Sequence, residues 1–204
     1  MMITMSKIMI GVVTCGIRKL KMKADDVYID KERKGAAHGR NFLIRKFMNE
    51  GAEHIFIFDD DTYPVLPMWK EKIIGWAALN DVHYLAGLDY KSISLLGAFG
   101  DTVVSQSPYS GAFCYIERKC VEKCGLFDEG YKKYGFEDVE YAMRAHHFGM
   151  TGKEGYYSPL WINMYIHSMD MFEENPKPNM TQEEKSKYIE LNSRKFEEDS
   201  RKWI

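Results

Sequence analysis

The 204-residue sequence lacks an excess of either charge, because 28 Lys and Arg residues face 30 Asp and Glu residues. A chain with a net charge of only -2 has no global positive field to gather nucleic acid or anionic lipid. It also lacks a transmembrane segment, since its apolar start, residues 1–13, is too short to span a bilayer. We therefore expect no strong nucleic-acid binding and no transmembrane segment.

Cysteine is scarce, with four residues at Cys15, Cys114, Cys120 and Cys124 and no CxxC pair. No secretory leader precedes them, so we expect reduced thiols in a cytoplasmic protein, with attachment to a membrane surface as the alternative. The spacing of Cys120 and Cys124 on one expected helix suits a metal. Packed core thiols are the favoured interpretation, because no second pair completes a site.

What is present is an alternation of apolar strands and amphipathic helices, in a chain long enough for one sizeable core. In the first ninety residues, the patterns predict strands at 8–13, 26–30, 54–58 and 82–88, and helices at 35–48 and 67–79. Such alternation is typical of an α/β fold with an open, mostly parallel sheet flanked by helices. A ligand is then expected at the carboxyl ends of the strands.

The second half of the chain carries fewer repeats of this pattern. We expect a strand at 110–116, helices at 117–124 and 136–148, and a last apolar stretch at 161–167. The segment Thr181-Gln182-Glu183-Glu184 predicts a capping box that opens a charged, amphipathic helix reaching Ile204. We therefore predict one domain over residues 1–174 and a C-terminal helical extension, 175–204, packed on it. Pairing with a second subunit or contact with a membrane remain alternatives for this helix.

Three consecutive aspartates, Asp59, Asp60 and Asp61, follow directly after the apolar strand at 54–58. Like charges about 4 Å apart repel by roughly 4 kcal/mol at an effective dielectric near 20, so a cation is expected among them. Hard carboxylate oxygens select Mg²⁺ or Mn²⁺. The alternative is a solvated turn, or a cap on the following helix, for which one aspartate would suffice.

A second acidic pair, Glu137 and Asp138, stands at the start of the expected helix 136–148, where the helix dipole favours carboxylates. A carboxylate fixed beside a cleft can serve as a general base, whereas the plain alternative is an acidic helix start. His167 follows an apolar stretch and is a candidate third ligand for the same metal, although a lone buried histidine is more often structural.

Taken in order, these segments resemble the GT-A glycosyltransferases of family 2. The resemblance covers nearly the whole chain and depends on the order and spacing of its motifs. Those motifs are Val13-Thr14-Cys15, Gly35-Ala36-Ala37-His38-Gly39-Arg40-Asn41, Ile55-Phe56-Ile57-Phe58-Asp59-Asp60-Asp61, Gly111-Ala112-Phe113, Gly125-Leu126-Phe127-Asp128-Glu129 and Gly135-Phe136-Glu137-Asp138-Val139-Glu140.

The resemblance implies a single GT-A domain that transfers a sugar, with inversion, from a nucleotide diphosphate donor, best guessed as a UDP-sugar. The acceptor would be the hydroxyl of a glycan, a lipid-linked sugar or another compound. The resemblance also implies that Asp59, Asp61 and His167 bind Mn²⁺ or Mg²⁺, and that Asp138, beside Glu137, has the catalytic role. Its donor-binding residues would be Thr14, Cys15, Asp30, Arg40, Asp59 and Asp60.

One departure from the family concerns the stretch between Cys15 and Gly35, which is shorter than the usual strand, helix and strand. We hypothesise that basic residues of this stretch, Arg18 and Lys19 among them, replace lost contacts to the nucleotide. Two other functions remain as alternatives. A sugar-nucleotide nucleotidyltransferase is disfavoured because no Gly-rich phosphate loop follows the first strand, and a non-catalytic binding module is disfavoured by the intact Glu137-Asp138 pair.

Overall fold

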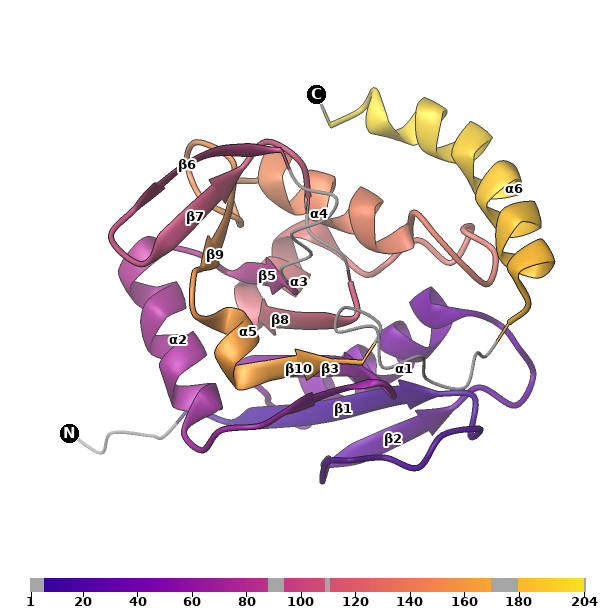
Figure 1. Ribbon diagram of the computed structural model, residues 1–204, viewed down its shortest axis with the longest axis horizontal. Helices are drawn as coiled ribbons and strands as arrows, with labels where there is room; N and C mark the ends of the chain where they lie inside the picture. The colour runs from indigo at the N-terminus through magenta and orange to yellow at the C-terminus, as the bar shows by residue number, and fades with distance from the viewer. Residues whose placement is uncertain (1–5, 88–93, 109–110, 170–179, 204) are drawn as a thin grey trace.

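The computed structural model describes residues 6–87, 94–108, 111–169 and 180–203 as an α/β fold around a five-stranded sheet (Figure 1). The strand order in this sheet is β2 (Asp26–Ile29), β1 (Ile8–Thr14), β3 (His54–Asp59), β8 (Phe113–Glu117) and β5 (Tyr84–Ala86). Strands β2, β1 and β3 are parallel, whereas β8 runs antiparallel to both β3 and β5. The expected α/β class is confirmed, but the sheet is mixed rather than mostly parallel.

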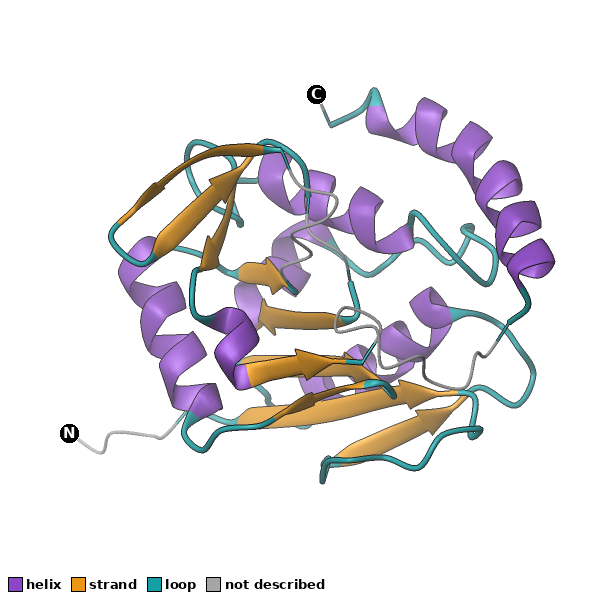
Figure 2. Cartoon of the chain, in the orientation of Figure 1, coloured by secondary structure: helices purple, strands orange, loops and turns teal. Residues whose placement is uncertain are grey.

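Helices cover the sheet on both faces (Figure 2). Helix α1 (Ala36–Asn49) packs on β1, where Gly11 leaves room for Leu43 and Phe47. On the other face, the rings of Phe56 and Phe58 contact Trp69 of α2 (Trp69–Asn80). Because side chains alternate along a strand, Asp59 at the end of β3 falls on the α1 face. Helices α3 (Arg118–Cys124) and α4 (Glu137–His147) complete the layer beside β8 and β5.

Two small sheets extend this core, and the sequence patterns did not predict them. Strands β6 (Leu95–Phe99), β7 (Thr102–Ser105) and β9 (Tyr156–Pro159) form an antiparallel sheet. The apolar stretch expected at 161–167 divides into a short helix, α5 (Ile162–Tyr165), and strand β10 (Ile166–Ser168). Strand β10 pairs with β4 (Thr62–Pro64), directly after the aspartate cluster.

Several element boundaries differ from the sequence patterns for local reasons. Helix α2 begins two residues after Pro67, because Met68 has a left-handed φ of 59°. Helix α4 likewise starts only after Phe136, because Phe136 has a left-handed φ of 73°. The strand expected at 82–88 is shortened to Tyr84–Ala86, and the one expected at 110–116 to Phe113–Glu117. Leu88 and Ser110, as well as the boundary proposed between residues 174 and 175, lie outside the described residues.

The predicted capping box of the C-terminal helix, α6 (Gln182–Ser200), is confirmed. The Thr181 hydroxyl accepts a hydrogen bond from the Glu184 amide, and the Glu184 carboxylate accepts one from the Thr181 amide. The helix ends at Ser200 rather than at Ile204, which lies beyond the described residues. No helix in the part of the chain that the structure describes is long and apolar enough to cross a bilayer.

Helix α6 contacts the rest of the chain at several points, and its buried residues are Asp199, which accepts a hydrogen bond from the Tyr131 hydroxyl at 3.0 Å, and Asn192. Asn192 makes the larger number of hydrogen bonds to the backbone. Its amide nitrogen donates to the carbonyls of Lys132, Tyr134 and Gly135, and its oxygen accepts from the Lys132 amide at 3.0 Å. The Trp203 indole, just past the helix, donates to Glu140 at 3.0 Å. The helix therefore fixes the loop that leads into α4.

We predict that Asn192→Ala lowers the free energy of unfolding by about 1–3 kcal/mol, since buried carbonyls would lose their donor. Urea unfolding followed by circular dichroism measures this change. Ser193→Ala is the matched control on the same helix, because the Ser193 hydroxyl bonds only to the helix carbonyl of Glu190 among the described contacts. Equal stability of the two variants would contradict the role given to Asn192.

Candidate active site

Two cavities open at the carboxyl end of β3, on either side of the aspartate cluster. The larger holds about 540 Å³ and is bordered by Asp138, Gly111 and Ser168. The smaller holds about 380 Å³ and is bordered by Thr14, Asp30 and Arg33. Residues common to both walls are Ala36, Asp59, Asp61, Lys133 and Tyr134. The aspartate cluster is thus the partition between two adjoining spaces, each large enough for part of a ligand.

Asp60 and Asp61 already share a cation. The Arg18 guanidinium donates through one nitrogen, Nη1, to Asp60 Oδ1 at 2.5 Å and to Asp61 Oδ2 at 2.9 Å. The Thr14 hydroxyl donates to the other Asp60 oxygen at 2.5 Å, so the Asp60 side chain is only 2% exposed. The Thr62 hydroxyl donates a hydrogen bond to the other oxygen of Asp61, Oδ1, at 3.3 Å. The repulsion expected within the cluster is therefore offset by a basic residue of the short stretch after Cys15.

Arg40 offsets the third aspartate from the opposite face. It is almost fully buried, and its guanidinium lies 3.2 Å from Asp59, 3.1 Å from Glu137 and 2.9 Å from the Gly111 carbonyl. Burial alone would lower the pKa of Arg40, but the carboxylates of Asp59 and Glu137 more than reverse this effect, so Arg40 stays charged. A contact of Arg40 with the nucleotide stays a prediction; Arg40 lies at the wall of the larger cavity and not at that of the smaller one.

The same burial acts on the carboxyl groups around Arg40. Burial, followed by the neighbouring Asp138 charge, raises the pKa of Glu137 to about 7, although Arg40 opposes the shift. Burial also raises the pKa of Asp59, whose side chain nevertheless keeps 36% of its surface open. Asp59 therefore faces both cavities, while Glu137 lies at the wall of the larger one with only 9% of its side chain exposed and is a partner for Arg40.

Asp138 lies in the wall of the larger cavity, in the first turn of α4. Its Oδ2 accepts a hydrogen bond from the Gly111 amide at 2.7 Å, and its Oδ1 accepts one from the Val139 amide at 2.9 Å. A Cβ atom at residue 111 would lie 2.5 Å from the Asp138 Cβ, so only glycine permits this approach. Asp138 is thus held at the cavity by two backbone amides.

The three candidates for the nucleotide half, Thr14, Cys15 and Asp30, all border the smaller cavity. Asp30 is buried, and its two oxygens accept hydrogen bonds from the amides of Lys34 and Gly35 at 2.9 and 2.8 Å. It therefore shapes the turn into α1. Cys15 is half-buried, and burial raises the pKa of its thiol. Ligand contacts by these residues stay predictions.

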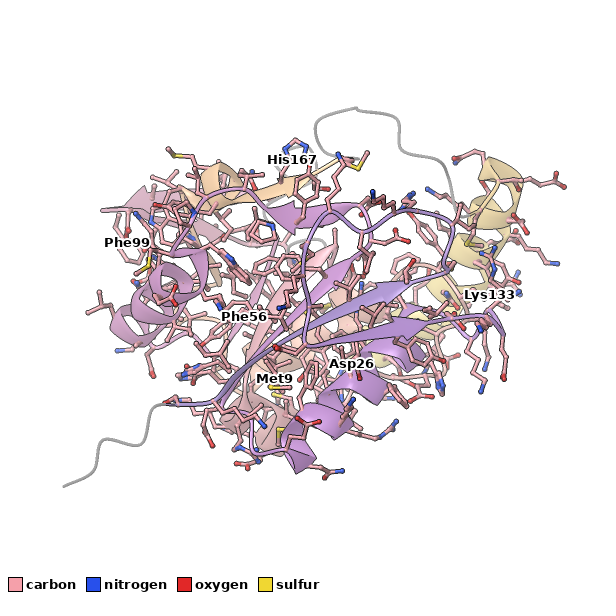
Figure 3. All side chains as sticks on the ribbon, turned by 90° about the horizontal axis from the view of Figure 1, so that it is seen from below. Met9, Asp26, Phe56, Phe99, Lys133 and His167 are labelled. Carbon is pink, nitrogen blue, oxygen red and sulfur yellow. The ribbon has the colours of Figure 1, made fainter. Side chains whose placement is uncertain are left out.

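His167 lies on β10, between two residues, Ile166 and Ser168, that border the larger cavity. Its ring packs against Tyr63 at a centroid distance of 5.1 Å, and Figure 3 shows it at the outer edge of the molecule. Because side chains alternate along a strand, Ser168 and Ile166 lie on the face of β10 that borders the cavity, and His167 lies on the opposite face. A metal-ligand role for His167 stays a prediction.

The chemistry of the aspartate cluster fits a hard divalent cation, since Asp59 and Asp61 border both cavities and the cluster already binds a guanidinium. Within the described ranges, however, no three His, Cys, Asp or Glu side chains are grouped to hold a metal ion. Any such cation would therefore take its remaining ligands from water or from a bound molecule.

The loop from Lys133 to Phe136 was not predicted as part of the site. Lys133 and Phe136 have positive φ values of 52° and 73°, and such strain gathers at functional sites; Gly135, at 90°, adopts its conformation freely. Gly35 approaches this loop so closely that a Cβ atom there would lie 2.8 Å from the Lys133 Cα. The glycines Gly35 and Gly135 were the signal in the sequence, but the approach of Gly35 to Lys133 is known only from the fold.

Comparisons with known proteins give limited matches. No protein-family model matches the sequence. A stretch of 36 residues, 18% of this chain, is 50% identical to the uncharacterized glycosyltransferase YfnE of Bacillus subtilis (strain 168) and spans only 9% of that relative's length. Among solved structures, the crystal structure of A197 from STIV aligns with 66% of this chain and 75% of its own, at 12% identity and a TM-score of 0.45. The sequence match supports a partial likeness to a glycosyltransferase.

We predict that Gly111→Ala lowers the free energy of unfolding by about 1–3 kcal/mol, because the added methyl group overlaps the Asp138 side chain. Urea unfolding measures the change. Gly75→Ala is the control, since a Cβ atom there meets nothing within 4 Å and alanine favours its helix. A Gly111→Ala protein as stable as the Gly75→Ala protein would show that the close approach to Asp138 is unimportant.

We also predict that Glu137 makes stability fall as the pH rises from about 4.5 to about 7. A raised pKa means that the folded state binds the proton more tightly than the unfolded state, so this contribution is present at low pH and lost across that window. Glu137→Gln should flatten this part of the stability curve, measured by urea unfolding at pH 5 and pH 7. The exposed Glu190→Gln should leave the slope unchanged.

Proposed function

We propose that this protein is a metal-dependent glycosyltransferase that moves a sugar from a nucleotide diphosphate donor, a UDP-sugar, to an acceptor hydroxyl. The observation that carries the proposal is the partition itself: Asp59 and Asp61 border both cavities, and the only other acidic residues lining the larger cavity are Glu137 and Asp138 in the described chain. A donor in one cavity and an acceptor in the other would meet at these carboxylates. The order of the sequence motifs and the short match to a glycosyltransferase support it.

The smaller cavity suits the nucleotide diphosphate. Arg18, Arg33, Lys133 and Lys185 place positive charge around its wall, which favours phosphate oxygens. Asp59 and Asp61 would hold Mn²⁺ or Mg²⁺ together with the diphosphate and water, as is usual for cations that bind substrate phosphates. When bound, the cation would stabilise negative charge on the leaving diphosphate.

The larger cavity suits the acceptor. Its Asp138 carboxylate is oriented by the amides of Gly111 and Val139 and can take the proton of an acceptor hydroxyl. The acceptor oxygen would form a bond to the anomeric carbon as the bond from that carbon to the diphosphate breaks, and one displacement inverts the configuration. General-base catalysis typically contributes roughly 10²–10⁴ in rate. Positioning of the two substrates on either side of the partition supplies the rest.

The direct test is to incubate the purified chain with MnCl₂ and a panel of UDP-sugars and to measure the release of UDP. Release that depends on both the metal and one sugar supports the proposal. Release of pyrophosphate from a sugar phosphate and UTP would favour a nucleotidyltransferase instead. Binding of a UDP-sugar without any turnover would favour a non-catalytic module.

Two substitutions separate the roles within the site. Asp61→Ala should lose metal-dependent binding of UDP, whereas Asp138→Asn should keep this binding and lose transfer by about 10²–10⁴. Isothermal titration calorimetry measures the binding, and UDP release measures the transfer. Normal turnover by Asp138→Asn would show that another residue is the base.

A further inference from the structure

Arg18 supplies the positive charge that bridges two of the three aspartates, Asp60 and Asp61. One of its nitrogens bridges Asp60 and Asp61 at 2.5 and 2.9 Å, and its side chain is 12% exposed at the wall of the smaller cavity. It lies between β1 and β2, within the stretch from Cys15 to Gly35 that is shorter than the resemblance implies, whereas Arg40 lies on α1.

The two arginines of the site differ in how they are held. Arg40 is 3% exposed, and its guanidinium contacts two carboxylates and a backbone carbonyl from three separate segments. Arg18 contacts two adjacent aspartates at the edge of a cavity that can hold a phosphate-bearing ligand. A second cation at Asp61 would repel the Arg18 guanidinium, whereas a diphosphate beside it would attract it, because the planar guanidinium matches phosphate oxygens.

We propose that Arg18 is an exchangeable counter-cation: it neutralises Asp60 and Asp61 in the free protein, yields Asp61 to a divalent cation, and then pairs with the donor diphosphate. The inference rests on the proposed function for the nature of the donor. It makes metal binding and diphosphate binding mutually dependent, since each favours the displaced position of Arg18. Such coupling is reciprocal and typically amounts to 5–150-fold in affinity.

The experiment measures Mn²⁺ binding by the electron paramagnetic resonance signal of free Mn²⁺, and UDP binding by calorimetry, for the full chain and for Arg18→Gln. Without UDP, Arg18→Gln should bind Mn²⁺ about tenfold more tightly than the unmodified protein, because its competitor is gone. At saturating Mn²⁺, it should bind UDP about tenfold more weakly, because the diphosphate loses its partner. Both shifts are required.

Two further variants control the test. Lys23→Gln removes the same charge from the same stretch, but Lys23 is exposed and borders neither cavity, so both affinities should stay unchanged. Arg18→Lys keeps the charge with a single point donor and should give values between those of the unmodified protein and Arg18→Gln. It preserves the test if Arg18→Gln fails to fold.

Mn²⁺ affinity that is unchanged or weaker when Arg18 is replaced would overturn the exchange, as would equal effects of Lys23→Gln. A protein that binds no Mn²⁺, with or without UDP, would overturn it too. Coupled Mn²⁺ and UDP binding with no sugar transfer from any donor would leave the exchange standing and refute the transferase. The two proposals therefore fail on different readouts.

Discussion

The buried guanidinium of Arg40 is the interaction on which the rest of the site depends. It joins α1 to the end of β3 through Asp59, to the start of α4 through Glu137, and to the segment before β8 through the Gly111 carbonyl. Removing one partner of a buried ion pair leaves an uncompensated charge at a cost of about 3–5 kcal/mol. Asp59 and Glu137, which border the larger cavity, are therefore fixed relative to one another by a nearly buried residue at the wall of the same cavity.

This arrangement divides the positive charge of the site between two kinds of residue. Arg40 is enclosed and stays charged because two carboxylates face it, so its position is structural. Arg18 neutralises the other two aspartates from the wall of a cavity, where a ligand can compete for it. A cluster of three aspartates is thus stable without a bound ligand, and one of its counter-charges remains available for exchange.

The parts of the fold that could be predicted from the sequence are those determined by neighbouring residues. The period of apolar residues gave β1, β3, α1 and α4 nearly to their ends, and the Thr181 capping box follows from a local pattern. The direction of β8 and the sheet of β6, β7 and β9 depend on pairing between distant segments. Short strands of this kind leave too weak a local pattern to be read.

In the site, too, local patterns could be predicted from the sequence and contacts between distant residues could not. The Asp59–Asp61 cluster and the Glu137-Asp138 pair were identified because each is a local run of carboxylates at the end of an element. The sequence could not show that Arg40 lies beneath both, since its two carboxylate partners are 19 and 97 residues away. Nor could it show that Asp30 is used by the backbone amides of its own turn, because a surface aspartate and a capping one look alike in sequence.

The C-terminal helix α6 forms part of the smaller cavity's wall, together with the stretch after β1. Met180, Glu184 and Lys185, at the start of α6, border the smaller cavity opposite Thr14 and Asp30. The same helix holds the strained Lys133 loop through Asn192, and that loop borders both cavities. The wall of the smaller cavity is therefore formed by residues between β1 and α1 and by residues from the C-terminal end of the sequence. The closing helix is part of the site's architecture rather than an appendage to it.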